Sequence, residues 1–393
     1  MKLLLCHNYY RQRGGEDESF EAEAALLASR GHRVVRYVRH NDEIDDSAPL
    51  RVAGQTLWSR ESAGAVASLI EEHRPDVLHV NNAFPLISPS VYREAKSRGV
   101  AVVQSLRNYR AFCVNGLLYR DGKVCTKCHT SSFAYSGLRH KCYRGSLASS
   151  TVVALGQASM RRQTIKRGQV DLFVTPSHFT REIYLQGGFD PQRVAVKPNF
   201  THPPSPSPDV AARDYGLYVG RVSEEKGIDV LCDAWRRDPT LGPLRIVGDG
   251  PARAQLQERT RDARVEWVGR CDQREALAQM AGAAFVVVPS VWYEVFGRTV
   301  VEAYAAGAPV IAARIGALPE LVDDGETGLL YDPQDSARLA AHAASLFADP
   351  VRARQLGENA RARYREAFTP ERNYEVLMDC YERAIHFSRS EQR

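Results

Sequence analysis

Charged residues and glycines gather in two stretches of the C-terminal half, and their types suit an anionic, hydroxyl-rich ligand. The first stretch, residues 218–227, carries Arg221 and Lys226. The second, residues 286–303, carries Glu294 and Glu302. Two cations can neutralise a diphosphate as it leaves, and carboxylates accept hydrogen bonds from hydroxyl groups. We therefore expect Glu294 to face a sugar and Glu302 to face ribose hydroxyls.

Spacing alone leaves alternatives open for these four residues. Glu302 could equally be an exposed helix residue, and the two cations could form a surface ion-pair loop with Glu224 and Glu225. Glycines at positions 220 and 227 bracket the cations and favour a binding loop over an ion-pair loop.

Each stretch reads as a buried strand, a loop and the start of a helix. A helix starting near Phe296 or Gly297 would present free backbone N–H groups at the carboxyl edge of a sheet, where open α/β sheets bind ligands. Gly297 would let a phosphate approach the backbone closely. The residues expected at this junction are Phe296, Gly297, Arg298 and Thr299.

Short apolar runs alternate with helical patterns along the whole chain, which predicts parallel, doubly wound sheets. The pattern pauses at the proline-rich residues 198–208 and restarts at Tyr215. We therefore expect two Rossmann-like domains, covering residues 1–200 and 209–370. The final helix, residues 371–393, is expected to cross back to the first domain.

Length and composition agree with two globular domains. The chain has 393 residues, 44% hydrophobic and 25% charged. No apolar run reaches the roughly 18–20 residues that span a bilayer, and the apolar start reads as a strand, so we expect a cytoplasmic protein. The net charge of +5 does not demand nucleic acid, and no nucleic-acid-binding module is recognisable.

Part of the positive charge is local. Seven cations lie close together and could be a solvated basic face, a pyrophosphate-facing patch or a contact with the inner membrane surface. They are Arg139, Lys141, Arg144, Arg161, Arg162, Lys166 and Arg167.

The C-terminal motifs resemble the family 4 retaining glycosyltransferases, which have the GT-B fold and use nucleotide sugars. The resemblance runs in the family's order through almost the whole C-terminal half. It is carried by Gly220-Arg221 with Glu225-Lys226-Gly227, residues 246–251, Val268-Gly269, Glu294 with Phe296-Gly297 and Glu302-Ala303, residues 306–312, and residues 325–330.

The resemblance implies roles for these residues. Arg221 and Lys226 would contact the donor diphosphate, Glu294 the sugar and Glu302 the ribose. Gly248, Gly269 and Arg270 would border the base, and Gly316 and Leu318 would line the cleft. Retention is usually described as front-face attack, with the leaving phosphate helping to deprotonate the acceptor. No catalytic metal is expected.

The N-terminal half resembles the family more weakly. Gly14 and Gly15 resemble a glycine loop that faces the donor phosphate, although an ordinary turn is the alternative. Arg107 aligns with a position where family members often have a histidine that contacts the donor sugar. An arginine cannot act as a base there, but it could still hydrogen-bond a donor sugar or phosphate. The departure suggests an unusual or acidic donor or acceptor, or a weakly active protein.

Four cysteines fall in a segment without clear periodicity, residues 108–149. Cys125 and Cys128 have the spacing of a zinc knuckle, and Cys113 and Cys142 flank them. A structural zinc ion bound by all four cysteines would stabilise this long insertion, which lies in the N-terminal domain expected to bind the acceptor. The alternative is a loop of free thiols.

These features predict a retaining hexosyltransferase of cell-surface glycan or glycoconjugate synthesis. It would move a sugar from a UDP- or GDP-sugar to a saccharide or lipid-linked saccharide acceptor. Two rival hypotheses are a nucleotide-sugar epimerase of the same architecture and a catalytically degenerate sugar-nucleotide-binding protein.

Overall fold

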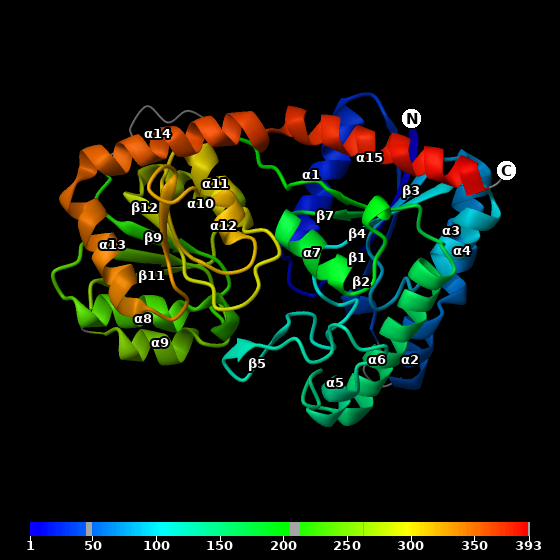
Figure 1. The fold of residues 1–393 in the computed structure, drawn as a ribbon, viewed down its shortest axis with the longest axis horizontal. Helices are drawn as coiled ribbons and strands as arrows, with labels where there is room; N and C mark the ends of the chain where they lie inside the picture. Colours follow the sequence, from blue (N-terminus) through cyan, green and yellow to red (C-terminus); the bar gives the residue numbers. More distant parts are fainter. Residues whose placement is uncertain (45–48, 205–212, 262, 392–393) are drawn as a thin grey trace. The chain divides into compact units, whose positions relative to one another are not determined.

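The chain forms two compact units in its computed structural model, which describes residues 1–44, 49–204, 213–261 and 263–391 (Figure 1). Unit 1 consists of Met1–Leu118, Cys125–Pro198 and Asn373–Arg393, and unit 2 consists of Tyr119–Val124 and Asn199–Arg372. Residues 205–208, part of the proline-rich stretch between the two predicted domains, lie outside the described residues. None of the described helices is long and apolar enough to cross a membrane.

Unit 1 is built on a parallel six-stranded sheet with the order β2-β1-β3-β4-β7-β8. Every residue of β3 and β7 is buried, as expected for a parallel sheet covered on both faces. The strands are β1 (Lys2–Tyr9), β2 (Arg33–His40), β3 (Val77–Asn82), β4 (Ala101–Ser105), β7 (Leu172–Thr175) and β8 (Val194–Val196).

The helices of unit 1 include the last helix of the chain. A core cluster joins Phe20 and Leu27 of α1 to Leu377 and Tyr381 of α15 over the strands. The helical elements are α1 (Gly15–Ser29), η1 (Asn41–Glu43), α2 (Pro49–Leu57), α3 (Arg60–His73), α4 (Ser90–Ser97), α5 (Tyr135–Arg139), α6 (Leu147–Arg161), η2 (Arg162–Lys166), α7 (His178–Gln186), η3 (Pro191–Arg193) and α15 (Pro370–Glu391).

The cysteine-containing segment has more structure than its sequence suggested. It holds α5 and a two-stranded hairpin, β5 (Tyr119–Arg120) with β6 (Lys123–Val124), and it leads into α6. The hairpin is part of unit 2, where the Tyr119 hydroxyl donates to Glu224 Oε1 at 3.2 Å. Packing and hydrogen bonds stabilise the rest of the segment: Gln157 Nε2 donates to the carbonyls of Arg110 and Cys113.

Unit 2 is built on a second parallel six-stranded sheet with the order β11-β10-β9-β12-β13-β14. Counted from β9, this is the 3-2-1-4-5-6 order of a Rossmann fold, and its switch point lies between β9 and β12. The strands are β9 (Gly216–Val219), β10 (Leu244–Val247), β11 (Val265–Gly269), β12 (Phe285–Val288), β13 (Val310–Ala313) and β14 (Gly328–Tyr331).

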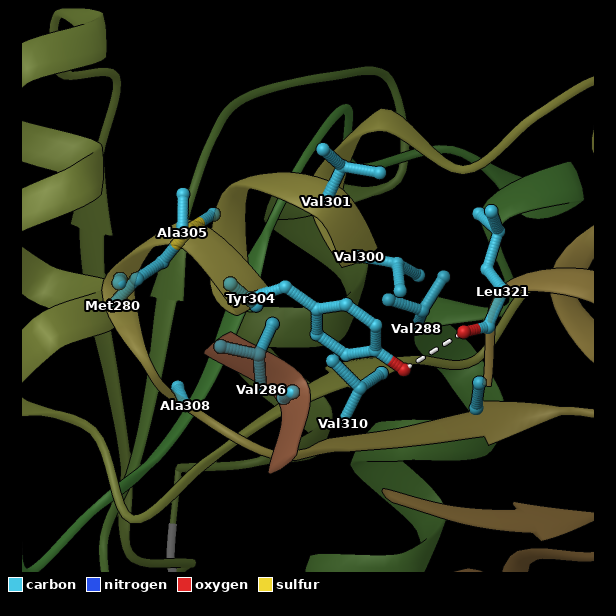
Figure 2. Close-up of a cluster of buried hydrophobic side chains, with 14 of the residues drawn as sticks. Met280, Val286, Val288, Val300, Val301, Tyr304, Ala305, Ala308, Val310 and Leu321 are labelled. Atoms are coloured by element: carbon cyan, nitrogen blue, oxygen red, sulfur yellow. Dashed lines mark hydrogen bonds between the residues drawn. The ribbon is translucent and has the colours of Figure 1, made fainter. Parts of the chain in front are cut away.

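The helices of unit 2 pack around a core that fixes α11. In Figure 2, Tyr304 of α11 lies among valines of β12 and β13, and its hydroxyl donates to the Leu321 carbonyl at 3.0 Å. The helical elements are η4 (Glu224–Lys226), α8 (Ile228–Arg237), α9 (Arg253–Arg259), α10 (Gln273–Gly282), α11 (Arg298–Ala306), α12 (Leu318–Leu321), α13 (Ser336–Ala348) and α14 (Pro350–Ala367).

Candidate donor site

The loops that follow β9 and β12 leave the sheet of unit 2 at its switch point. The two strands are hydrogen-bonded neighbours, with Val286 opposite Leu217. Ligands of open α/β sheets bind outside the carboxyl ends of the strands at such a point. The two predicted stretches therefore lie side by side, as a donor site requires.

The loop after β9 is held against the loop after β12 by a glycine contact. Gly227 has a φ of +65°, and a Cβ atom at this position would lie 2.0 Å from the Pro289 carbonyl oxygen. The Val291 N–H also donates to the Glu225 carbonyl at 3.1 Å. Any larger residue at position 227 would push the two loops apart.

A second glycine packs the chain after β13 against Glu294. Gly316 has a φ of +61°, and its Cβ would lie 2.4 Å from the Glu294 backbone nitrogen. The Ala317 N–H donates to the Glu294 carbonyl at 2.9 Å. The Glu294 backbone is thus fixed by the chain that follows β13.

Lys226 and Glu294 form a short ion pair across these loops. Lys226 Nζ lies 2.6 Å from Glu294 Oε1, which also accepts a hydrogen bond from Ser290 Oγ at 2.6 Å. Burial raises the pKa of Glu294, but the Lys226 ammonium and the hydrogen bonds from Lys226, Ser290 and Trp292 outweigh burial and lower the pKa below its usual value. Glu294 is therefore a carboxylate at neutral pH.

Arg221 lies on the same loop but faces solvent. Its side chain is 62% exposed, and its Nη2 lies 3.3 Å from Glu225 Oε1. Part of the alternative ion-pair loop is thus present, while Lys226 is turned to Glu294 instead. The exposed guanidinium is accessible to a ligand that could displace Glu225.

Helix α11 begins one residue after Gly297, which has a φ of +102°. A Cβ at Gly297 would lie 2.8 Å from Leu318 Cδ2, so local packing already requires a glycine there. Arg298 Nε lies 2.8 Å from Glu302 Oε1 one turn along this helix, and the Glu302 side chain is only 13% exposed. Phe296 is buried, and Thr299 Oγ1 donates to the Val219 carbonyl at 3.4 Å.

The predicted base-side residues form an interlocked turn. The Gly248 N–H donates to the Gly269 carbonyl at 2.7 Å, and a Cβ at Gly248 would lie 1.8 Å from the Gly220 oxygen. Arg270 is exposed and lies 3.8 Å from Asp249. The loops after β9, β10 and β11 thus support one another.

The predicted donor residues of unit 1 lie around the start of α1. Gly14 is its N-cap and Gly15 its first residue. Gly14 has ordinary extended backbone angles, and a Cβ there would meet nothing within 4 Å, so nothing in the described structure requires a glycine at this position. Asp17 points inward, accepting from the Gly14 N–H at 3.0 Å and pairing with His7 at 2.7 Å.

Arg107 is turned into unit 1. Its Nη2 lies 2.5 Å from Glu23 Oε1, and its side chain is 6% exposed. Lys197 Nζ contacts the same carboxylate oxygen at 2.5 Å. The position where the family often has a histidine therefore belongs to a buried charge network in this chain.

The four cysteines are free thiols, and Cys113 Sγ donates to Asn115 Oδ1. Burial raises the pKa of Cys128, and the nearby thiols of Cys113 and Cys125 raise it further. Within the described ranges, no three His, Cys, Asp or Glu side chains are grouped so that they could hold one metal ion. A four-cysteine cluster is therefore not found among the described residues, where the segment packs through Val114, Ala134, Val153 and Ala154.

Sequence reasoning missed two residues at the Lys226–Glu294 pair and one beside Arg221. Ser290 bonds Glu294, Trp292 lies under Lys226 with its ring centroid 5.1 Å from Nζ, and the Tyr218 hydroxyl donates to the Arg221 carbonyl. Ser290 and Trp292 lie within the quoted stretch, but no spacing rule marks them because loop geometry brings them to the pair.

Two protein-family models match the chain, one in each half. A model described as "Glycosyl transferase 4-like domain" matches residues 14–199, and one described as "Glycosyl transferases group 1" matches residues 210–363. This chain is a family 4 glycosyltransferase. The glycosyltransferase is accordingly a transferase enzyme with two parallel α/β domains.

Known proteins agree with this assignment over different shares of the glycosyltransferase. Glycogen synthase of Mycobacterium tuberculosis is 38% identical over 159 residues, which are 39% of this chain and 38% of the synthase. A 42.6 kDa protein of the cps region of Klebsiella pneumoniae is 27% identical over a match that covers 82% of this chain and 87% of the Klebsiella protein.

A solved structure shows the same GT-B fold. The Anabaena protein HepE, crystallised with UDP-glucose, has a TM-score of 0.69 and 19% sequence identity, covering 96% of this glycosyltransferase and 98% of HepE.

Proposed function

We propose that this protein is a retaining hexosyltransferase that moves a sugar from a nucleotide-sugar donor, UDP- or GDP-linked, to a saccharide or lipid-linked saccharide acceptor. Such a reaction would belong to cell-surface glycan or glycoconjugate synthesis. The observation that carries the proposal is the Lys226–Glu294 pair at the switch point of unit 2. The UDP-glucose bound by HepE supports UDP as the nucleotide to test first.

The Lys226–Glu294 pair can supply two things that sugar transfer needs: a cation for the diphosphate and an acceptor for the sugar hydroxyls. A diphosphate can replace Glu294 as a partner of Lys226, and Arg221 on the same loop can neutralise the second phosphate as the sugar bond breaks. Glu294, fixed by Gly316 and Ala317 and held ionised, can accept hydrogen bonds from the sugar hydroxyls. In this scheme the leaving phosphate helps to deprotonate the acceptor, so Glu294 is not required as a nucleophile.

The remaining predicted residues complete the proposed donor set. Glu302 would bind ribose, with Arg298 as its present partner, and Gly248, Gly269 and Arg270 would border the base. Gly14 and Gly15 would face the donor phosphate from the first domain. In this proposal residues 1–200 with 371–393 bind acceptor, and residues 209–370 bind donor.

Structural zinc on Cys113, Cys125, Cys128 and Cys142 stays a prediction from the cysteine spacing. The two-residue spacing of Cys125 and Cys128, with Cys113 and Cys142 nearby in the sequence, is what supports it. Metal analysis of purified protein decides between zinc and free thiols.

Two variants test the proposed roles through different readouts. Lys226→Ala should weaken binding of the nucleoside diphosphate, whereas Glu294→Gln should keep that binding and lower transfer by about 100-fold or more. The measurements are UDP affinity by calorimetry and acceptor-dependent UDP release from UDP-hexose.

The matched controls are Lys166→Ala and Glu326→Gln, which change exposed residues of the same types. Both should leave UDP affinity and transfer unchanged. Release that needs no acceptor would point to an epimerase or hydrolase, and full transfer by Glu294→Gln would rule out the role given to that residue.

A further inference from the structure

Negative charge is missing from one part of unit 1. Residues 125–170 contain no Asp or Glu but eight Lys and Arg residues. The whole chain has 52 cationic and 47 acidic residues, so the remainder of the chain is net negative. The positive net charge is therefore concentrated in this segment, which forms α5, α6 and their connections.

Most of these cations are exposed. Arg161 is the exception, because it donates to the carbonyls of Ser131 and Gly187. In the part of the chain that the structure describes, none of the others forms an ion pair. The exposed set is Lys127, Arg139, Lys141, Arg144, Arg162, Lys166 and Arg167.

Large apolar side chains are exposed among the same cations. Tyr135 of α5 is 71% exposed, and Leu147 and Leu155 of α6 are 53% and 44% exposed. The described chain has seven exposed large hydrophobic residues, and these three are joined by a fourth, Leu50, on α2. Scattered single residues would be ordinary, but this concentration on neighbouring helices indicates a binding surface.

The packing of these helices explains why the apolar residues face outward. α2 and α5 both pack against α6 (Figure 1). Ala134 and Ala154 belong to one buried cluster, whereas their sequence neighbours Tyr135 and Leu155 are exposed. Gly156 packs on Thr56 of α2, where a Cβ would lie 3.2 Å from Thr56 Cγ2.

We propose that this basic apolar surface binds an anionic lipid bilayer. The surface consists of Leu50, Tyr135, Leu147 and Leu155 with Arg139, Lys141, Arg144 and Arg162. Lysine and arginine near a bilayer are attracted to anionic headgroups, and exposed leucine and tyrosine gain by entering the interfacial region. The two contributions act together, as stable peripheral binding requires.

Other occupants fit the surface less well. A nucleic acid would use the cations but gain little from exposed leucines, because its specific partners are phosphates and base edges. A second copy of this chain would bring two positive surfaces together. The lipid surface is the partner that both the charge and the apolar residues favour, and this inference does not depend on the proposed donor chemistry.

Vesicle flotation of the full-length protein tests the proposal. Vesicles contain phosphatidylcholine, alone or with one-third phosphatidylglycerol. We expect binding only to the anionic vesicles and weakening at high salt. Two double variants, Leu147→Ser with Leu155→Ser and Arg139→Glu with Lys141→Glu, should each lower the bound fraction by about tenfold or more.

The matched control is Val351→Ser with Arg354→Glu on α14, which removes an exposed apolar residue and an exposed cation in unit 2. It should bind vesicles like the unaltered protein, and an unchanged midpoint of urea unfolding shows that each variant is folded. Equal losses in the control and the two variants would overturn the proposal. So would an absence of flotation, or DNA binding that the leucine variant leaves intact.

Discussion

The carboxylate of Glu23 is the centre of a buried charge network in unit 1. It pairs with the Arg107 guanidinium and the Lys197 ammonium. All three charges interact electrostatically with His79. His79 also hydrogen-bonds the hydroxyls of Tyr381 and Ser105, both at 2.9 Å. Burial and the two cations together lower the pKa of His79 from 6.5 to about 4, against the opposing charge of Glu23.

This pKa predicts a loss of stability in mild acid. The folded protein holds His79 neutral. The contribution of His79 to the free energy of unfolding is therefore complete above pH 6.5 and is lost as the pH falls towards 4. At pH 5 the loss should be about 2 kcal/mol relative to pH 7.5. His79→Gln, which keeps polar contacts to Tyr381 and Ser105, should lack this part of the pH dependence in urea unfolding.

The exposed His140→Gln is the control for this experiment. Its unfolding free energy should fall between pH 7.5 and 5 by as much as that of the unaltered protein. A fall of the same size in His79→Gln would show that the acid sensitivity comes from other groups.

Residue types were easier to predict than their partners. Glu294 and Lys226 were both expected in the donor site, and the structure brings them together. Arg107 was expected to face a ligand, yet it pairs with Glu23, 84 residues earlier in the sequence. Nothing in a local pattern reveals a partner so distant, because the fold alone brings the two side chains together.

Close contacts between loops position the donor site at the scale of elements. The η4 loop can lie on the loop after β12 only because position 227 has no Cβ. A left-handed backbone alone costs an alanine about 1–2 kcal/mol. Because the Cβ would also clash with Pro289, Gly227→Ala should destabilise the protein by more than about 2 kcal/mol in total. It should also weaken UDP binding about tenfold or more. Unfolding in urea and calorimetry with UDP measure the two effects.

Gly145 provides a matched control because it also has a φ of +65°, but a Cβ there would meet nothing within 4 Å. Gly145→Ala should show the conformational cost alone and leave UDP binding unchanged. If the two variants behaved alike, the contact with Pro289 would not matter to the site.

The start of α11 at Arg298 lies within two residues of the start predicted near Phe296 or Gly297. Helix α6 was not predicted, because its run of Ala, Gly, Ser and Thr gives no clear apolar stripe. The hairpin of β5 and β6 was also missed, since its two-residue strands are too short for a period. Tertiary packing decides both elements.

At the scale of the whole molecule, a ligand that binds only unit 2 should stabilise unit 2. A nucleotide at 100 times its Kd adds about 2.7 kcal/mol to the stability of the state that binds it. We expect UDP to raise the Tm of the intact protein, and EDTA to leave the increase in place because Lys226 and Arg221 supply the positive charge.

Comparison of UDP, GDP and their sugars in the same assay identifies the base. Lys226→Ala should lose most of the increase in Tm, and Lys166→Ala should keep it. An increase that EDTA removes would instead assign phosphate binding to a metal ion.

The discontinuity of unit 1 has a consequence for how the protein is made. The core around β1 and α1 includes four residues of α15: Leu377, Cys380, Tyr381 and Ala384. The ribosome adds them more than 340 residues after β1 and α1 begin. All of unit 2 is synthesised before residues 373–393, which complete unit 1. The first sheet must wait, with part of its apolar face uncovered, until the last helix emerges, so this half of the chain needs protection from aggregation during translation.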